Sequence, residues 1–494
     1  MPPAGLPDAF LERGEAPLAG LLVRFARGRG PFTTAEAAER FSLSLERAEE
    51  ELAALERDAR LVRGELRPGG SEREWCEPDV LRRLRRASLA ALRKEVEPVE
   101  QRALGVFLPA WQGIDRRATL REALVPLQGI SLPVPLWERD VLPRRVPGYQ
   151  PAQLDQLTAS GEVVWIGAGL ERVAIYFRED APALSRPSAL APPDGEVHER
   201  VRGALGQGAL FWFDLVRAAG TEAEVVLPAL WDLVWAGEVT NDAWQPLRAE
   251  RRFAAPRAEK RPRRFSRSRA NAITATQGRW SSTARLFEPR PGSDPAHVRD
   301  GRALAELLLE RHGIVTREGV RAEGIPGGYW PIYQELRKLE TLGVCRRGYF
   351  VEGLGGAQFA LPGAVERLRE KFEEERTLVI AAADPAQPYG AALPWPKRSG
   401  ARAARVAGAY VVLLDGEAAL FVDRGGRSLV PLREPEEEWL RRALGALVAH
   451  VPRMGVKRLA IERFDGQSVG ETMLMPLLLE AGYHAGPRRA VLRA

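Results

Sequence analysis

Apolar positions at helical spacing are followed by short β-type segments in a pattern that occurs four times along the chain. Each copy is an amphipathic helix ending in leucine, a small residue four positions later, and a segment that predicts a strand. The copies begin at Leu55, Leu157, Leu233 and Leu339, and their small residues are Ala59, Gly161, Gly237 and Gly343. Glycine suits a helix C-cap that requires a left-handed backbone. The irregular spacing predicts separate modules rather than a solenoid.

The fourth copy shows the complete unit. Leu304, Leu307 and Leu308 line a first helix, "TREGVRAEG" predicts a short second helix, and "WPIYQELRKLETLG" predicts a third. The stretch "RRGYFVEGLGGAQFAL" (residues 346–361) then predicts a two-stranded ribbon with a glycine-rich turn. Three helices and a ribbon form the winged-helix variant of the helix-turn-helix, whose third helix enters a major groove. The alternative is a ribbon that only covers the core or contacts another protein chain.

The repeated pattern predicts an α+β chain of tandem winged-helix modules. We expect winged helix 1 with a basic connecting helix at residues 1–115, winged helix 2 at 116–190, winged helix 3 at 191–250, a basic linker at 251–295, and winged helix 4 at 296–372. The ribbon of the third module is expected to turn at Asn241 and Asp242. Alternating apolar residues around an Asp415–Gly416 turn predict a small antiparallel β-barrel at 373–432, followed by a C-terminal α/β, winged-helix-like module at 433–494.

Two stretches concentrate positive charge. "VLRRLRRASLAALRKEVEPVE" predicts a helix with one apolar side and several cations, and "RAERRFAAPRAEKRPRRFSRSR" has almost no apolar content. The second stretch contains Arg261, Arg263 and Arg264. Such cations can neutralise DNA phosphates with a salt-dependent gain in affinity. A solvated spacer is the alternative interpretation.

The composition gives the chain a net positive charge and excludes several kinds of site. The net charge is +6, and only six of the 72 basic residues are lysines. The planar guanidinium fork suits phosphate and guanine edges, although a GC-rich genome also inflates arginine. Two cysteines, Cys76 and Cys345, and five scattered histidines exclude a disulfide framework and a Cys-rich zinc site. Without a membrane span or signal peptide, we expect a cytoplasmic protein with no metal, cofactor or membrane partner.

Motifs of the common catalytic families are absent. The sequence has no P-loop, no Gly-x-Ser-x-Gly elbow, no kinase motif set and no His-Glu-x-x-His, so we expect no ATP-driven motor in this chain. Polar residues do gather in "LQGISLPVPLWERDVLPRRV": Gln128, Glu138, Asp140, Arg144 and Arg145. A buried glutamine must find hydrogen-bond partners, so a structural role for Gln128 is the alternative to a functional one.

Several long strings resemble the C-terminal region of the large helicase-related protein family, Lhr. They include "EWCEPDVLRRLRRASLAALRKEVEPVE", "FLPAWQGI", "GIVTREGVRAEGIPGG" and "DPAQPYGAALPWP", and the similarity spans nearly the whole chain. The family's helicase motor is missing here. The resemblance implies an array of winged helices with a β-barrel, oligomer formation, DNA repair including uracil removal, and kinship with the AlkZ-type DNA glycosylases.

The resemblance also implies roles for particular residues. The AlkZ-type motif is Gln-x-Gln or Gln-x-Asp, and Gln128 matches its first position. The second position is Ile130, which can neither accept nor donate a hydrogen bond, so the chain departs from the motif there. Under this reading Gln128 positions a water, and Glu138 or Asp140 supplies the missing carboxylate.

We further expect the remaining candidates to hold DNA. Trp111 and Gln112 would line a base pocket, with core packing as the alternative for Trp111. Phosphates would be held by a set of cations, with surface ion pairing as the alternative: Arg144, Arg145, Arg261, Arg263, Arg264, Arg337, Lys338, Arg346 and Arg347.

Two functional hypotheses follow from these residues. In the first, the chain is a monofunctional DNA glycosylase that flips a uracil or another damaged base and hydrolyses its N-glycosidic bond without a cofactor. In the second, it is a non-catalytic DNA-binding and oligomerisation module that partners a helicase. A transcription regulator is a third possibility, against which the absence of a ligand-sensing domain counts.

Overall fold

The computed structural model describes residues 16–67, 73–95, 98–185, 188, 190–249, 275–287, 301–370, 375–398 and 402–493, with side chains left undescribed at 89–95. The chain divides into two compact units, each described here by itself. One unit comprises Met1–Glu97 with Thr341–Gly343, and the other comprises Pro98–Glu340 with Val344–Ala494. No helix in the described part of the chain combines the length and the apolar character that a membrane crossing requires.

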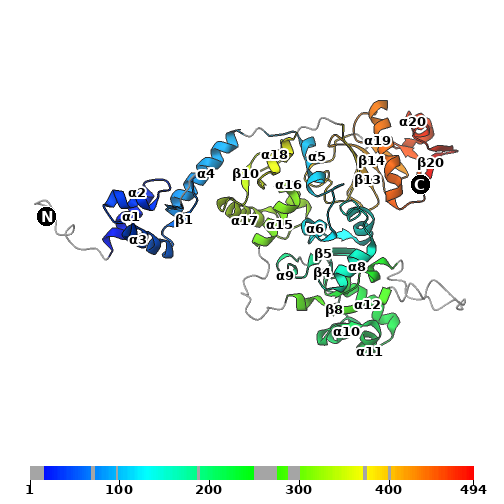
Figure 1. Cartoon of the computed structure of the whole chain (residues 1–494). Coiled ribbons are helices and arrows are strands. Elements are labelled where there is room, and N and C mark those ends of the chain that lie inside the picture. The colour runs from blue at the N-terminus through cyan, green and yellow to red at the C-terminus, as the bar shows by residue number, and fades with distance from the viewer. Residues whose placement is uncertain are drawn as a thin grey trace, which may run out of the picture. The chain divides into compact units, whose positions relative to one another are not determined.

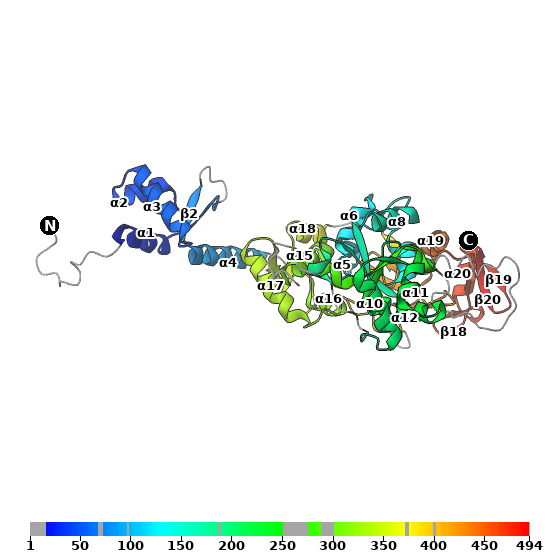
Figure 2. The same ribbon diagram turned by 90° about the horizontal axis from the view of Figure 1, so that it is seen from below.

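The first unit contains three helices, a ribbon and a long helix that extends from them (Figures 1 and 2). They are α1 (Pro17–Arg27), α2 (Thr34–Phe41), α3 (Leu45–Arg57), β1 (Val62–Gly64), β2 (Glu74–Cys76) and α4 (Pro78–Glu95). A capping box starts α2: the Thr33 hydroxyl accepts from the Glu36 amide at 3.2 Å, and the Glu36 carboxylate accepts from the Thr33 amide at 2.8 Å. The predicted three helices with a two-stranded ribbon are therefore present, and the turn at 68–70 lies outside the described residues.

The second module begins earlier than the sequence suggested. Its elements are α5 (Gln101–Trp111), α6 (Leu120–Leu124), η2 (Val125–Leu127), β3 (Leu132–Pro133), α7 (Val134–Leu136), η3 (Trp137–Val141), α8 (Pro151–Ala159), β4 (Val163–Gly167), β5 (Arg172–Phe177) and α9 (Ala181–Leu184). The three strands form a sheet in the order β3-β5-β4. Helix α5 thus lies within the range expected for the first module, but it packs in the second unit.

The ribbon of the third module differs from the expectation. Its elements are α10 (Glu196–Gln207), β6 (Leu210–Phe211), α11 (Trp212–Ala219), α12 (Ala223–Trp235), β7 (Val239–Asn241), α13 (Gln245–Arg248), β8 (Arg279–Ser282) and η4 (Thr283–Leu286). Strand β7 pairs with β8, which lies inside the range expected to be linker. The expected return strand after Asn241 is wrong because buried Trp244 and Leu247 turn the chain into α13 instead.

The fourth module matches the predicted three helices and wing. Its elements are α15 (Gly301–His312), β9 (Ile314–Val315), α16 (Arg317–Ala322), α17 (Tyr329–Thr341), β10 (Arg346–Gly348), β11 (Gln358–Ala360) and α18 (Ala364–Arg369). Ile332, Leu336 and Leu339 are buried, as their spacing on α17 predicted. Gly353 and Gly356 take positive φ angles of 69° and 80° in the turn between β10 and β11. A left-handed backbone is accessible to glycine without strain, which explains the glycine-rich wing.

The C-terminal part contains two sheets and two main helices. One sheet has the order β12-β13-β14-β15-β17-β18, and the other has the order β16-β20-β19. The strands are β12 (Thr377–Ala381), β13 (Tyr410–Leu414), β14 (Glu417–Val422), β15 (Ser428–Pro431), β16 (Arg458–Ile461), β17 (Arg463–Phe464), β18 (Gln467–Ser468), β19 (His484–Gly486) and β20 (Arg489–Arg493). The helical elements are α19 (Glu437–His450), η6 (Val451–Met454), η7 (Val469–Glu471) and α20 (Leu474–Glu480). Among the described strands no pairing joins the edges β12 and β18, so the expected closure into a barrel is not seen.

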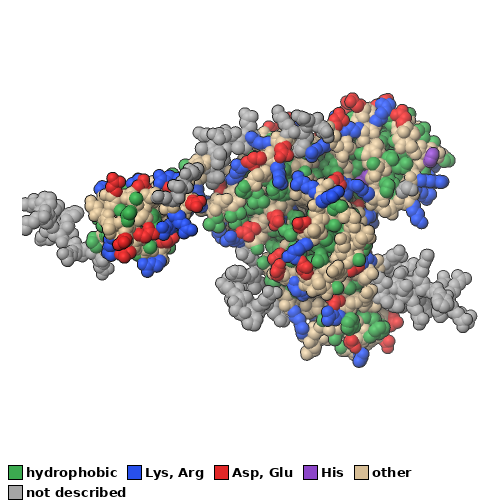
Figure 3. Space-filling view, viewed as in Figure 1, with side chains coloured by type: hydrophobic (Ala, Val, Ile, Leu, Met, Phe, Trp, Pro, Cys, Tyr) green, Lys and Arg blue, Asp and Glu red, His purple; other side chains and the backbone are tan. Residues whose placement is uncertain are grey.

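A close backbone approach joins α5 to the β13–β14 hairpin. A Cβ atom added at Gly105 would lie 1.9 Å from the carbonyl oxygen of Gly416, so only glycine fits at this contact. A continuous hydrophobic cluster extends from the second and third modules to the six-stranded sheet and the C-terminal helices. On the face seen in Figure 3, positive and negative side chains are interspersed rather than segregated.

Candidate active-site cleft

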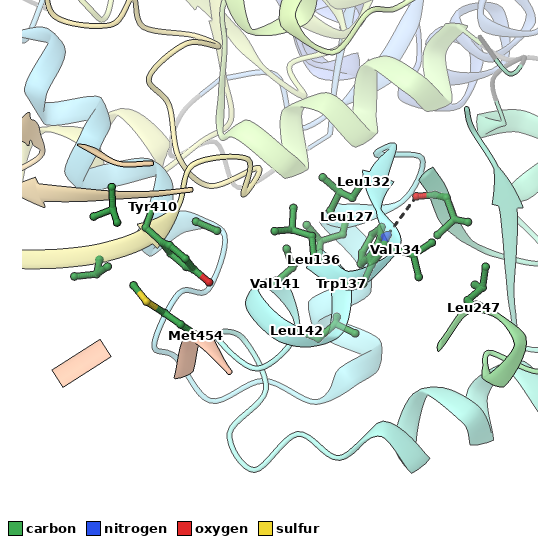
Figure 4. Packing of buried hydrophobic residues seen from close by; sticks show 14 of the residues in the cluster. Leu127, Leu132, Val134, Leu136, Trp137, Val141, Leu142, Leu247, Tyr410 and Met454 are labelled. Atoms are coloured by element: carbon green, nitrogen blue, oxygen red, sulfur yellow. Dashed lines mark hydrogen bonds between the residues drawn. The ribbon is translucent and has the colours of Figure 1, made fainter. Parts of the chain in front are cut away.

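The segment from Val134 to Leu142 is anchored by buried apolar side chains, which Figure 4 shows, and it also contains Glu138, Arg139 and Asp140. Val134, Leu136, Trp137, Val141 and Leu142 are at most 3% exposed. The Trp137 indole donates to the carbonyl oxygen of Val173 at 3.2 Å, which fixes the segment to β5. The anchored turn η3 is π-helical, a geometry frequent at functional sites.

A cleft of about 810 Å³ opens beside this segment. It is lined by residues of the second module, by the end of β12 and by residues around the C-terminal end of α19. The ionisable side chains in its lining are Asp115, Arg116, Glu138, Arg139, Asp140, Arg144, His450 and Arg453. The structure therefore brings together the predicted Glu138, Asp140 and Arg144, and adds His450 and Arg453 from a distant part of the chain.

Asp140 is the most deeply placed carboxylate of the cleft, at 5% exposure. One oxygen accepts from the Tyr410 hydroxyl at 2.9 Å, and the other accepts from Arg139 Nε at 2.8 Å. Burial raises the pKa of Asp140 above its ordinary value, and the bonds from Arg139 and Tyr410 partly oppose that rise. A carboxyl group with a raised pKa can exchange a proton closer to neutral pH, as general acid–base chemistry requires.

His450 lies against Tyr410 and Arg144 in the same cleft. Its ring packs edge-on against Tyr410 with centroids 5.5 Å apart. Its Nδ1 lies 3.4 Å from Arg144 Nη1. Burial, followed by the charges of Arg144 and Arg453, lowers the pKa of His450 to about 4. The imidazole is therefore neutral near pH 7.

Glu138 is held firmly by its neighbours. Arg248 makes two bonds of 2.7 Å to the two carboxylate oxygens, which further accept from Tyr149 at 2.9 Å and from the Trp244 indole at 3.1 Å. Its side chain is 16% exposed. With four donors on its two oxygens, Glu138 is suited to positioning the second and third modules against one another rather than to holding a water.

Arg144 and Arg145 point to different surroundings. Arg144 lines the cleft and donates to the Val379 carbonyl at 2.8 Å and to Asp115 at 2.7 Å. Arg145 is 1% exposed and grips Asp384 with two bonds of 2.8 and 3.0 Å. This pairing leaves Arg145 no exposed surface for a phosphate, which favours the ion-pair alternative over DNA contact for that residue.

Gln128 lies apart from the cleft. Its amide nitrogen donates to Asp180 at 2.9 Å, and its amide oxygen accepts from the Phe177 backbone at 2.9 Å. The following residues, Gly129 and Ile130, line a second cavity of about 890 Å³. The structure thus separates Gln128 from Glu138 and Asp140, and the bonds of its amide match the structural alternative.

Of the two expected pocket residues, Gln112 is buried in the second unit and Trp111 is partly buried at its surface. Trp111 stacks on Phe107 with centroids 5.3 Å apart and donates to the Glu310 carbonyl at 2.7 Å. Gln112 is 4% exposed and accepts from Arg145 at 3.1 Å. Neither residue lines the cleft or the second cavity. Stacking on Phe107 and the bond to Glu310 therefore account for the position of Trp111.

The expected DNA-binding cations of the fourth module differ in exposure. Arg337 and Lys338 are exposed on α17, where Lys338 pairs with Glu335 at 2.7 Å. Arg346 pairs with Glu366, and Arg347 donates to the Tyr333 hydroxyl at 3.0 Å. The linker cations lie outside the described residues: Arg261, Arg263 and Arg264.

Sequence reasoning missed the residues that complete the cleft. Tyr410 is 270 residues from Asp140 in the chain, and His450 is 306 residues from Arg144. His450 is the last residue of an amphipathic helix. That pattern predicts where the residue lies in the helix but does not indicate that it belongs to a site. Among the described residues no group of three or more His, Cys, Asp or Glu side chains could hold a metal ion.

Comparisons with known proteins place the chain in a family. Two winged-helix domain models of the large helicase-related protein match residues 99–178 and 294–378. A Mycolicibacterium smegmatis protein named "Lhr helicase/ probable uracil glycosylase" is 41% identical over 99% of this chain and 35% of its own length. The Escherichia coli "Lhr helicase/uracil glycosylase" is 30% identical over 98% of this chain and 34% of its own length. The chain thus spans about a third of the length of these relatives.

One solved structure found by the comparison is the Streptomyces sahachiroi DNA glycosylase AlkZ. It matches 74% of this chain with a TM-score of 0.44 and 16% identity. The family match rests instead on the two domain models and on the identity along nearly the whole chain. The chain therefore belongs to the large helicase-related protein family and corresponds to its C-terminal region.

Proposed function

We propose that the chain is a DNA-binding repair protein that removes a damaged base, of which uracil is the first candidate, by hydrolysing its N-glycosidic bond. Support comes from the winged-helix modules and from the names of the two curated relatives. The observation that carries the catalytic part is the cleft in which Asp140, with its raised pKa, lies among arginines. The hydrolysis consumes only water, so the proposal includes no cofactor.

The cleft offers the groups that such a reaction needs. A glycosylase moves the target nucleotide out of the stack into a pocket, and 810 Å³ lies in the range of small-molecule sites. A carboxylate has about four acceptor sites, and two donors bind Asp140, so a water can also be accepted there. In this mechanism ionised Asp140 takes a proton from that water while the oxygen of the water bonds to the sugar carbon. The N-glycosidic bond breaks, and the base leaves with the bonding electron pair.

The arginines of the cleft have a separate role in this proposal. Arg453 is 62% exposed at the rim, and Arg116 is also exposed. Both are placed to hold the phosphates that flank a flipped nucleotide, since phosphate contacts fix the position of DNA without reading its sequence. The neutral His450, which lines the same cleft, adds no further positive charge near pH 7.

A uracil-containing oligonucleotide tests this function. The full chain is incubated with single- and double-stranded substrates, and alkali then cleaves the strand wherever a base has been removed. We expect cleavage at the uracil, and a reduction of at least about 100-fold in the Asp140→Asn variant. Asp214→Asn removes an exposed carboxylate on α11 and serves as the matched control, with unchanged cleavage. Equal cleavage by Asp140→Asn and the control would remove Asp140 from the mechanism.

A second candidate is a non-catalytic module that binds DNA and supports an oligomer or a helicase partner. The observation that favours it is the 128–130 turn, where Ile130 replaces a polar residue and the amide of Gln128 binds Asp180 and Phe177. Gln128→Ala separates the candidates. Loss of cleavage with retained folding would restore a catalytic role to Gln128, whereas a gel shift without cleavage of any damaged substrate would favour the second candidate.

A further inference from the structure

An exposed tryptophan stands at the start of helix α17. Trp330 is 63% exposed, although tryptophan has a large apolar ring that is usually buried on folding. Seven other tryptophans, by contrast, are at most 1% exposed: Trp75, Trp137, Trp165, Trp231, Trp235, Trp244 and Trp280. The exposure of Trp330 therefore suggests that the surface around it binds a partner.

The indole is held from beneath by a ladder of aromatic rings. Trp330 is stacked on Tyr333 with centroids 5.6 Å apart and planes at 18°. Tyr333 in turn meets the fully buried Phe359 edge-on at 5.7 Å. Arg347 donates to the Tyr333 hydroxyl at 3.0 Å, which fixes the middle ring. The exposed ring is therefore fixed in place, so little side-chain entropy is lost when a flat partner binds it.

Polar and cationic groups share the face of α17 with this ring. Gln334, Arg337 and Lys338 follow Trp330 by four, seven and eight positions, which is one side of a helix, and all are exposed. Two carboxylates are also near: Glu335 pairs with Lys338, and Glu340 lies 3.4 Å from Arg347. A flat aromatic ring beside two cations matches the chemistry of a nucleotide, which has a base to stack and a phosphate to neutralise.

The third helices of the other modules lack this combination. Helix α3 contains five glutamates and two arginines, and α8 contains no lysine or arginine. Helix α12 also has neither, and seven of its residues are buried. Among these four helices, α17 alone combines an exposed aromatic ring with an exposed pair of cations.

We propose that Trp330 is a stacking site for an unpaired base of single-stranded DNA, with Arg337 and Lys338 beside its phosphates. A base within a duplex already has neighbours on both faces, so only an unpaired base can lie flat on the indole. This inference deepens the proposed function by naming a DNA contact, and it rests on DNA binding but not on base excision.

Two oligonucleotides of equal length distinguish stacking from charge. The first is a 15-nucleotide thymidine strand, and the second is a 15-nucleotide strand of abasic tetrahydrofuran units, which retains the phosphates without the bases. Fluorescence anisotropy of each strand is measured with the full chain and with Trp330→Ala, Trp330→Phe and Phe213→Ala. Phe213 is the matched control, because it is an 80% exposed aromatic residue on α11 of a module whose α12 has no cations.

We expect the thymidine strand to bind the parent chain more tightly than the abasic strand. Trp330→Ala should weaken thymidine binding by about 5-fold to 100-fold and leave abasic binding unchanged, and Trp330→Phe should retain most of the affinity. A thermal melt confirms that each variant is folded. Phe213→Ala should behave like the parent chain.

Other outcomes would overturn the inference. Equal weakening of both strands by Trp330→Ala would mean that the residue supports the fold or the charges. No weakening of either strand, together with an altered elution volume in size-exclusion chromatography, would make the ring a protein contact. The excision assay is read separately: a chain that stacks thymidine but leaves uracil in place keeps this inference and loses the proposed glycosylase activity.

Discussion

Two ionisable residues of the cleft are shifted by the same physical cause. Burial penalises charge, so it raises the pKa of Asp140 and lowers that of His450 to about 4. Both shifts favour the neutral forms: Arg139 opposes the shift of Asp140 only in part, and the charge of Arg144 adds to the shift of His450. The cleft therefore contains proton-exchanging groups whose charge depends on pH, surrounded by guanidinium groups whose charge does not.

The shift of His450 predicts an acid-dependent loss of stability. An unfolded histidine takes up a proton below about pH 6.5, but folded His450 does so only near pH 4. The stability that neutral His450 contributes is complete above pH 6.5 and is lost as the pH falls from 6.5 toward 4, by at most about 3 kcal/mol. Urea unfolding at pH 7 and pH 5 should show a smaller loss for His450→Gln than for the parent chain. Equal losses would contradict the assignment.

Individual site residues could be predicted only where their neighbours are close in the chain. Asp140 became a candidate through the resemblance, because Ile130 leaves the AlkZ-type motif without its second polar residue and a nearby carboxylate could take that role. Arg145 was expected to contact a phosphate, but it is buried against Asp384, which lies 239 residues further along the chain. No local sequence pattern predicts that Asp384 is the partner of Arg145, and none predicts that Tyr410 contacts Asp140.

At the scale of elements, a glycine contact ties α5 to the six-stranded sheet. We expect Gly105→Ala to destabilise the second unit by about 1–3 kcal/mol or more, because its Cβ would lie 1.9 Å from a backbone oxygen of Gly416. Gly203→Ala on α10 is the matched control, since no atom lies within 4 Å of its added Cβ. That control should stabilise the chain by about 0.5–1 kcal/mol. Chemical denaturation measures both, and a neutral result for Gly105→Ala would refute the contact.

The elements themselves were largely predictable because their signals are local. The four small residues after the repeated leucines all take positive φ: Ala59 at 55°, Gly161 at 77°, Gly237 at 80° and Gly343 at 78°. These residues end the helices as the sequence predicted. The third ribbon was not predictable in the same way, because its strand β8 begins 38 residues after the last residue of β7, Asn241.

At the scale of the whole molecule, many described arginines form ion pairs with carboxylates, and the linker sequence adds a further cluster of cations. The cluster of Arg261, Arg263 and Arg264 is predicted to neutralise phosphates. Replacing all three by alanine should reduce the slope of log affinity against log salt by about 2 to 3 for duplex DNA. The triple lysine variant keeps the charge and should keep the slope. An unchanged slope in the alanine variant would make this stretch a spacer.

The arrangement of the cleft also reflects the whole molecule. Its lining comes from the second module, from β12 and from the end of α19, which share one hydrophobic cluster. A site assembled from such distant segments forms only when the complete unit is folded. This is why the sequence could suggest Glu138 and Asp140 but could not show that both line the cleft, or that the donors already bound to each leave room for a water only at Asp140.

The most direct test of base excision is alkaline cleavage of a uracil-containing strand after incubation with the purified chain. We predict a single break at the uracil, its absence in an otherwise identical thymidine strand, and its loss in Asp140→Asn while Asp214→Asn remains active. An intact uracil strand, at protein concentrations where a gel shift shows the same strand fully bound, would contradict the account.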